Sequence, residues 1–300
     1  MADSTNHKLT SVLVTGANGQ LGSELRMLAS ACDSINFIFT DIEDVDITDA
    51  DRVERYLQDI KPDFIVNCAA YTAVDRAEDD SENSFLLNAE APKNLATSSK
   101  RIGAKLIHIS TDYVFNGKSW EPYNENHPTS PNSVYGWSKL KGEEAVLSHG
   151  NGMVIRTSWL YSAHGNNFVK TIARKGQELN NLKVVFDQIG SPTWANDLAK
   201  AIIEIIKKSE HQFVSEVFHY SNEGVSSWYD FAKEIISFLK INCSVSPVLS
   251  AEYKVAANRP PFSVLNKEKI KRTFEIQIPY WKESLHSCLK SMAIEVNNLK

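Results

Sequence analysis

Tyr135 and Lys139 are the two side chains of this sequence best placed to do chemistry together. They stand four residues apart in a stretch with the pattern of a helix, 135–147, so both project from one face, one turn apart. A cation beside a phenol favours the phenolate and lowers the phenol pKa from its usual value of about 10. The pair therefore predicts general acid or base chemistry near neutral pH. The same spacing also occurs on ordinary helix surfaces, so the neighbouring motifs have to decide.

Thr111 is predicted to lie close to this pair. A strand expected over 104–109 delivers Ser110 and Thr111 to the carboxyl edge of a parallel sheet, where ligands bind in open sheets. The segment 116–133 is rich in Pro, Asn and Ser and predicts a loop, after which the helix begins.

A glycine-rich turn follows the first predicted strand, 10–15, and leads into a helix. Its spacing is G-x-x-G-x-x-G. Such glycines permit a tight turn, let a phosphate approach the backbone, and let the helix pack close to the strand. A plain structural turn is the alternative, but the position between strand and helix favours a dinucleotide pyrophosphate at the helix N-terminus. The predicted cofactor residues here are Gly16, Asn18, Gly19, Gln20, Leu21 and Gly22.

Asp41 ends the second predicted strand, 36–40. A carboxylate at this place commonly accepts hydrogen bonds from the adenine ribose and repels a 2′-phosphate, which slightly favours NADH over NADPH. The alternative is an ordinary loop carboxylate, because 41–52 holds many acids. Asp46 and Ile47 are expected near the adenine, and Thr48 or Asp49 is expected to cap the helix that follows.

A third strand, 63–68, runs into small residues that would let a cofactor lie against the backbone, although ordinary close packing would use them too. The predicted contacts at this point are Ala69, Ala70 and Tyr71.

Five strand–helix units predict an α/β fold, a Rossmann-type doubly wound parallel sheet with a smaller C-terminal substrate-binding lobe. The expected division is an NAD(P)-binding domain over 10–160, with returning elements from about 180–210, and a mainly substrate-binding lobe over 161–300. The segment 81–102 is expected to form one long helix.

Composition excludes several classes of protein. The net charge is −5 with no basic block, which argues against nucleic acid or an anionic membrane as partner. The first nine residues lack the apolar stretch of a signal peptide, and no run has the length of a membrane span. The four cysteines have no metal-binding or redox spacing, so a reduced cytoplasmic setting is expected, with disulfides as the alternative.

Taken together, the motifs resemble the extended short-chain dehydrogenase/reductase superfamily and, more closely, the dTDP-4-dehydrorhamnose reductase family within it. The resemblance covers about residues 10–290. It rests on seven blocks in order: GANGQLG at 16–22, VNCAAYTAVDRAE at 66–78, STDYVFNG at 110–117, VYGWSKLKGE at 134–143, RTSWLYSAHGNNF at 156–168, DQIGSPT at 187–193 and RPPFSVL at 259–265.

The resemblance implies that NADH or NADPH reduces the C4 ketone of a dTDP-linked deoxyhexulose. Thr111, Tyr135 and Lys139 would be the catalytic residues: Tyr135 the proton donor, Lys139 the residue that binds the nicotinamide ribose, and Thr111 the residue that holds the carbonyl oxygen. The implied substrate-binding residues are Thr72, Val74, Thr111, Asp112, Trp159 and Arg259.

Trp159 would pack against the sugar, and Arg259 would pair with the diphosphate. A core aromatic and a surface arginine are the respective alternatives.

Two positions depart from the family pattern. Phe262 stands where a polar residue is usual, which puts the nucleotide contact there in doubt. Some members bind a metal between carboxylates at a dimer interface; Glu24 matches one ligand, but Asn196 stands where an acid is expected, so no metal is predicted. The expected assembly is a monomer or a homodimer.

Other functions compete with this one. A nucleotide-sugar dehydratase usually has an acid where Tyr113 stands, which argues against that reaction. Another nucleotide-sugar reductase or an epimerase uses the same Tyr and Lys. A regulatory subunit, similar to the β-subunit of methionine adenosyltransferase, can keep all three residues without catalysing a reaction.

Overall fold

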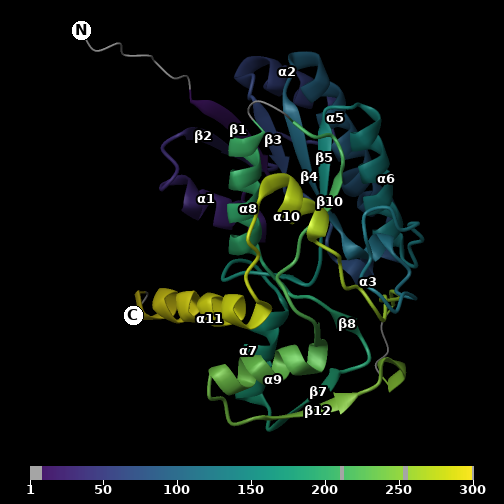
Figure 1. Cartoon of the computed structure of the whole chain (residues 1–300), viewed down its shortest axis with the longest axis vertical. Coiled ribbons are helices and arrows are strands. Elements are labelled where there is room, and N and C mark those ends of the chain that lie inside the picture. Colours follow the sequence, from purple (N-terminus) through teal and green to yellow (C-terminus); the bar gives the residue numbers. More distant parts are fainter. Residues whose placement is uncertain (1–8, 210–212, 253–255, 299–300) are drawn as a thin grey trace.

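A computed structural model describes residues 9–209, 213–252 and 256–298 of the chain. Six parallel strands form its central sheet, in the order β10-β5-β4-β3-β1-β2 (Figure 1). Their bounds are β1 Thr10–Thr15, β2 Ile35–Thr40, β3 Phe64–Asn67, β4 Lys105–Thr111, β5 Gly152–Thr157 and β10 Val217–His219. The predicted α/β class and parallel sheet are confirmed.

Helices cover both faces of this sheet (Figure 1). The central strands are mainly apolar because each face is buried, and a few buried polar residues interrupt them. One face packs against α1 (Gln20–Ala29), α8 (Ala195–Lys208) and α10 (Glu268–Phe274). The other packs against α2 (Ala50–Ile60), α5 (Ala91–Ile102) and α6 (Val134–Ser148). The strand order reverses between β1 and β3, the place where open α/β sheets bind ligands.

Side-chain caps fix where the helices begin. Asp49 accepts a hydrogen bond from the Arg52 N–H and so starts α2, which decides between Thr48 and Asp49. Ser133 accepts from the Gly136 N–H and starts α6. This cap places Tyr135 in the first turn of α6, at the carboxyl edge of the sheet.

The segment predicted as one helix over 81–102 has a defect. A π-helical turn at Leu86–Glu90 separates α4 (Ser81–Phe85) from α5. The Asn88 side chain in this turn bonds both backbone groups of Tyr71, N–H and C=O, at 2.9 and 3.0 Å. The turn thus places the Asn88 side chain where it holds Tyr71, a residue of the cavity wall. Such π-turns often occur at functional sites. A single helical turn, α3 (Val74–Ala77), precedes it.

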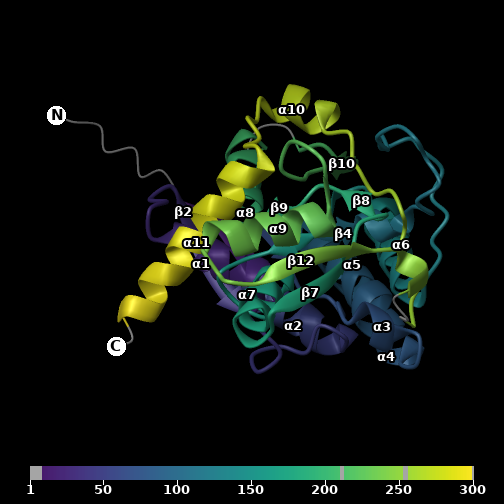
Figure 2. The ribbon, with the colours of Figure 1, turned by 90° about the horizontal axis from the view of Figure 1, so that it is seen from below.

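A smaller lobe lies below the sheet (Figures 1 and 2). Its own core joins α7 (Phe168–Glu178), α9 (Trp228–Phe238) and α11 (Trp281–Asn298) to a parallel pair of strands, β7 (Asn181–Val185) and β12 (Ser244–Val248). Helix α9 opens with a capping box between Ser227 and Asp230. The short remaining strands are β6 Leu160–Tyr161, β8 Ile189–Gly190, β9 Thr193–Trp194 and β11 Ser226–Ser227.

The chain crosses between the two parts more than once. Helix α8 returns to the sheet within the predicted stretch of 180–210, and β10 then adds the sixth strand beyond that stretch. Among the residues described, no helix has both the length and the apolar character that crossing a bilayer requires.

Candidate active site

One large cavity runs from the glycine-rich turn, past the carboxyl ends of β3, β4 and β5, to the smaller lobe. Its volume is about 2090 Å³, well above the roughly 300–1,000 Å³ of a site for one drug-sized ligand. The cavity therefore has room for a dinucleotide and a second ligand end to end. Every residue predicted from the sequence as catalytic, cofactor-binding or substrate-binding lines it, apart from Gly22.

The glycine-rich turn is built so that the chain can pass close to its neighbours. Gly16 has a positive φ of 64°, and a Cβ there would lie 2.6 Å from the Ala69 nitrogen. A Cβ on Gly22 would lie 2.5 Å from the Gly16 carbonyl oxygen, so Gly22 serves helix–strand packing behind the cavity. Gly19, the N-cap of α1, has no side chain to occupy the N–H groups of the first turn. This cradle fits a pyrophosphate at the start of α1.

Asp41 lies at the tip of β2 on the rim of this part of the cavity. Its carboxylate accepts hydrogen bonds from the backbone N–H groups of Asn18 and Ile42, at 2.8 and 2.9 Å. These bonds fix a negative charge beside the glycine-rich turn. Asp46 lines the cavity with Ile47, and its pKa is lowered by hydrogen bonds from the Thr48 hydroxyl and N–H.

The segment after β3 forms the cavity wall between the cofactor end and the sheet edge. Ala69 and Ala70 present backbone and methyl groups there. The Tyr71 hydroxyl donates to the Asp80 carboxylate at 2.9 Å, which anchors its ring. Thr72 and Val74 line the next part of the wall.

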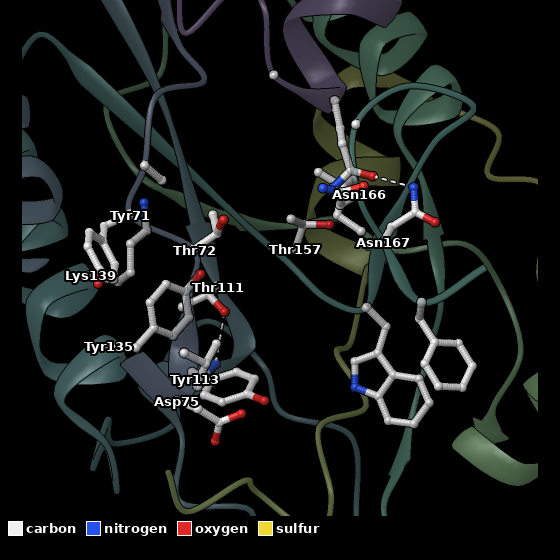
Figure 3. Close-up of a pocket in the computed structure, with 18 of the residues that line it drawn as sticks. Tyr71, Thr72, Asp75, Thr111, Tyr113, Tyr135, Lys139, Thr157, Asn166 and Asn167 are labelled. Atoms are coloured by element: carbon white, nitrogen blue, oxygen red, sulfur yellow. Dashed lines mark hydrogen bonds between the residues drawn. The ribbon is translucent and has the colours of Figure 1, made fainter. Parts of the chain in front are cut away.

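Thr111, Tyr135 and Lys139 meet at the sheet edge. Figure 3 shows them on one side of the cavity, across from Asn166 and Asn167. All three are at least nine-tenths buried. The Thr111 hydroxyl accepts a hydrogen bond from the Tyr113 N–H at 3.2 Å, and the Tyr113 ring packs edge-on against Tyr135 with 5.4 Å between centroids. The Lys139 ammonium donates to the Ile109 carbonyl at 2.6 Å.

The prediction that Lys139 makes Tyr135 more acidic is wrong for the protein alone. Burial raises the pKa of Tyr135 to about 12; the Thr111 hydroxyl opposes this rise and the Asp112 carboxyl adds to it. Burial lowers the pKa of Lys139 to about 8. Spacing predicted that the two residues share a helix face, but it could not show how deeply the phenol is buried. Tyr135 therefore carries its proton at neutral pH, as a proton donor must.

Asp112 is the most unusual carboxyl of the cavity. It is 2% exposed, and burial raises its pKa to about 7, against hydrogen bonds that lower it. The Ser263 hydroxyl lowers this pKa most among its neighbours, and the Thr111 hydroxyl donates to Asp112 Oδ1 at 3.0 Å. Near neutral pH this carboxyl can switch between donating and accepting a hydrogen bond.

Trp159 forms the wall opposite the sheet edge. Its backbone is left-handed, with φ of 46°, and its ring stacks on Trp228 at 3.7 Å between centroids. The indole N–H donates to the Ser263 hydroxyl at 3.1 Å, and a Cβ on Gly190 would collide with the ring. Three segments distant in sequence thus hold this indole in place. The Trp159 side chain packs against other residues and also lines the cavity. It therefore combines features of a core aromatic and of a tryptophan that faces the substrate.

Arg259 lines the cavity but binds a carboxylate of this chain. It forms a bidentate pair with Asp75, at 3.2 and 2.6 Å. Burial tends to raise the pKa of Asp75, but Arg259 and the Ala257 N–H hold it below its usual range. The arginine is not a free surface residue, and two of its five N–H donors are engaged within the chain.

The two departures from the family pattern also have defined places. Phe262 packs on the cluster around Tyr123, with 6.2 Å between ring centroids, rather than lining the cavity. The two carboxylate oxygens of Glu24 accept hydrogen bonds from Ser162 and Asn196, at 2.6 and 2.9 Å. No cluster of three or more His, Cys, Asp or Glu side chains suited to a metal occurs within the described residues.

Sequence reasoning missed several residues of the cavity. Asp75 holds Arg259 and Trp228 holds Trp159, yet neither lies near its partner in sequence. Asn167 caps α7 and donates to the Gln20 side chain at 3.0 Å, which joins the lobe to the glycine-rich turn (Figure 3). An Asn before a helix is a recognisable signal, but its second contact is not. Lys175 and Lys183 add positive charge at the lobe end of the cavity.

Comparison with known proteins places the chain among reductases. A family model described as "RmlD substrate binding domain" matches residues 10–294. The dTDP-4-dehydrorhamnose reductase of Burkholderia thailandensis is 37% identical over 295 residues, covering 94% of this chain and 98% of that protein. A probable dTDP-4,6-dihydroxy-2-methyloxan-3-one 4-ketoreductase of Streptomyces antibioticus is 40% identical, covering 91% of this chain and 92% of that protein.

A solved structure agrees with these relatives. The crystal structure of a dTDP-4-dehydrorhamnose reductase from Bacillus anthracis, in complex with NADP, superposes with a TM-score of 0.90. It is 40% identical in sequence and covers 95% of this chain and all of that one.

Proposed function

Because this chain belongs to the RmlD substrate-binding-domain family, whose curated relatives include dTDP-4-dehydrorhamnose reductases, we propose that it is an oxidoreductase of that kind. It reduces the C4 ketone of dTDP-4-dehydro-6-deoxy-L-mannose (dTDP-4-dehydrorhamnose) to give dTDP-L-rhamnose, at the expense of NAD(P)H. The observation that carries the proposal is the single cavity that joins the glycine-rich turn, the Thr111–Tyr135–Lys139 edge and the Trp159 wall.

The cofactor-binding residues follow from the cradle. The pyrophosphate would lie on the backbone of Gly16 to Leu21 and the adenine ribose near Asp41, with Ala69 to Tyr71 along its length. When bound, NAD(P)H supplies the hydride. The Lys139 ammonium, held at the Ile109 carbonyl, would bind the nicotinamide ribose.

Tyr135 is the proton donor in this proposal. The ketone oxygen lies within hydrogen-bond reach of its phenol and of the Thr111 hydroxyl, and it takes the phenol proton as negative charge develops. A pKa of about 12 keeps the phenol protonated until that moment. Burial of the three side chains excludes water that would weaken these interactions.

The rest of the substrate extends toward the lobe. The Trp159 indole provides an apolar surface for the deoxysugar, with Thr72 and Val74 on the wall and Asp112 able to bond a sugar hydroxyl. Arg259 offers its remaining donors to the diphosphate. In this division, the sheet with α8 and β10 binds the cofactor, and the lobe binds the nucleotide sugar.

The surroundings of the enzyme are also proposed. The Cys32, Cys68 and Cys243 thiols are not joined in a disulfide in the described part of the chain, which suits a reducing compartment such as the cytoplasm. The engaged oxygens of Glu24 support an enzyme without a metal bridge, as a monomer or a homodimer held by other contacts.

A second candidate is a reductase of a different 4-keto sugar nucleotide, which the similarity to the Streptomyces antibioticus ketoreductase favours. It would use the same Tyr135 and Lys139. The residues of the sugar-binding wall would then have to discriminate between the two sugar nucleotides.

Turnover tests both candidates. The substrate dTDP-4-dehydrorhamnose, also called dTDP-6-deoxy-L-lyxo-4-hexulose, is made in situ from dTDP-glucose by the preceding enzymes. The loss of NADH or NADPH absorbance is then followed. Rapid oxidation with formation of dTDP-L-rhamnose is expected. Oxidation only with another 4-keto sugar would support the second candidate, and cofactor binding without any turnover would support a regulatory subunit.

A further inference from the structure

A row of buried polar side chains crosses the sheet beneath the cavity floor. Thr15 on β1, Asn67 on β3 and His108 on β4 are direct partners in the strand register, and each is no more than 1% exposed. The Thr15 hydroxyl donates to Asn67 Oδ1 at 2.8 Å, and Asn67 Nδ2 lies 3.0 Å from His108 Nδ1. Buried polar groups of this kind are kept only when their hydrogen bonds are satisfied.

The row fixes which nitrogen of His108 carries the proton. The backbone N–H of Ala69 points at Asn67 Oδ1 at 3.2 Å, and because an N–H can only donate, the atom it meets must be the amide oxygen. The amide NH₂ of Asn67 therefore faces His108 Nδ1, which must accept. Burial holds the pKa of His108 well below its usual value, so the ring is neutral. A neutral imidazole that accepts at Nδ1 carries its proton on Nε2.

This N–H points at the lysine of the active site. His108 Nε2 lies 3.5 Å from Lys139 Nζ, and two donors cannot form a hydrogen bond to each other. The ammonium turns instead to the Ile109 carbonyl at 2.6 Å, and Lys139 also lines the cavity. The imidazole therefore offers the ammonium no hydrogen-bond acceptor on this side. One possible hydrogen bond of Lys139 within the protein is lost.

We propose that His108, held by Asn67 as its Nε2–H tautomer, is a positioning residue that directs the free N–H groups of Lys139 toward the cofactor. The proposal rests on the proposed function, in which Lys139 binds the nicotinamide ribose. If Nε2 were an acceptor, the ammonium would bond to the imidazole and lose part of its reach toward the cavity.

Other groups around Lys139 are consistent with this role. Burial lowers its pKa to about 8, while Glu143 on the next turn of α6 and the Cys68 thiol at the end of β3 oppose that fall. Burial raises the pKa of Cys68, so the thiol stays neutral near pH 7. Arg156 binds the Glu143 carboxylate in a buried pair at 2.7 Å, which weakens the carboxylate's pull on the ammonium.

Nitrogen NMR of the free enzyme tests the tautomer directly. Protein labelled with ¹⁵N-histidine is recorded in a long-range ¹H–¹⁵N correlation experiment, and the His108 signals are assigned by their absence in His108→Gln. The expected result is a neutral ring with its proton on Nε2, unchanged from about pH 5 to about pH 8. A proton on Nδ1, or on both nitrogens, would overturn the proposal. Should His108→Gln not fold, Lys139→Met assigns the same signals by their displacement.

Asn67→Asp tests the consequence for the cofactor. A carboxylate can only accept, so it draws the proton to His108 Nδ1 and leaves Nε2 to accept from Lys139, unless the ring takes up a second proton. The NMR spectrum of the variant distinguishes these two states. In the first, NADPH should bind about tenfold more weakly than to the wild type at pH 7, because the ammonium now bonds to the imidazole and no longer directs its N–H groups into the cavity. Binding is measured by cofactor fluorescence, without substrate.

Asn151→Asp is the matched control. Asn151 lies at the opposite end of the sheet, where it bonds Ser99 and the Ala104 carbonyl, so the affinity of this variant for NADPH should equal that of the wild type. An unchanged affinity in Asn67→Asp with a switched tautomer would refute the role of His108. These measurements use only free enzyme and NADPH. They can therefore be interpreted even if the enzyme does not reduce the proposed sugar.

Discussion

The sheet edge and the facing wall of the cavity are built in different ways. Thr111, Tyr135 and Lys139 come from one strand and the next helix, and short-range caps and strand pairing place them. The wall depends on contacts between segments far apart in the chain: Arg259 is held by Asp75, 184 residues away. We infer that the edge sets the chemistry and the wall sets which nucleotide sugar binds.

Tyr135→Phe should have the largest effect, because it removes the proton donor of the edge. We expect kcat to fall by about 10²-fold or more with little change in KM. Tyr161→Phe is the control, since this buried tyrosine lies in the core of the lobe and its hydroxyl has no hydrogen-bond partner among the described residues. Full activity of Tyr135→Phe would mean that another group donates the proton.

Arg259→Ala should affect the wall and not the edge. We expect KM for the sugar nucleotide to rise about tenfold, a loss of roughly 1.4 kcal/mol in binding, with kcat within about twofold. Asp75→Asn should act in the same direction, because it leaves the arginine without its anchor. Steady-state kinetics at saturating NADPH gives both constants.

Arg101→Ala is the control for that pair. Arg101 pairs with Glu54 on the exposed surface, where such a pair contributes little. A fall in kcat at unchanged KM for Arg259→Ala would contradict the separation of wall from edge.

Asp112→Asn tests how strongly the edge is sealed from water. The folded-state pKa of about 7 lies above the unfolded value near 3.8, so the folded protein binds the extra proton between these values. Stability is therefore full at low pH and falls as pH rises through this window, by roughly 1 kcal/mol per pH unit. The variant cannot titrate there and should lose this slope relative to wild type.

Urea unfolding of both proteins from about pH 4 to about pH 7 measures that difference. Parallel stability curves would mean that the Asp112 carboxyl is hydrated and ionised as in the unfolded chain.

Asp41→Ala should give the smallest effect, at the exposed cofactor end of the edge. Removing the carboxylate removes both a ribose acceptor and a charge that repels a 2′-phosphate. We expect the ratio of kcat/KM for NADPH over NADH to rise severalfold, about fivefold. Asp51→Ala serves as the control, because this exposed carboxylate in the first turn of α2 does not line the cavity. An unchanged ratio in Asp41→Ala would make Asp41 an ordinary loop carboxylate.

The same contrast explains what the sequence could predict. The glycine spacing, the alternation of strands and helices along the chain, and the Tyr135–Lys139 interval are local patterns. They led to the prediction of the parallel sheet and of the residues of the edge. The Asp75–Arg259 pair and the Trp159–Trp228 stack join distant segments and leave no periodic signal. The pKa of Tyr135 was predicted in the wrong direction, because spacing shows which charge is near and not how deeply the phenol is buried.

Transfer of deuterium tests the central claim most directly. The enzyme is given NADPH carrying deuterium at the transferable C4 position of the nicotinamide, together with dTDP-4-dehydrorhamnose made in situ, and the sugar product is examined by NMR and mass spectrometry. One deuterium at C4 of dTDP-L-rhamnose is the predicted result, with the same label but far slower formation in Tyr135→Phe. Product without deuterium at C4, or no product while NADPH still binds, would contradict the account.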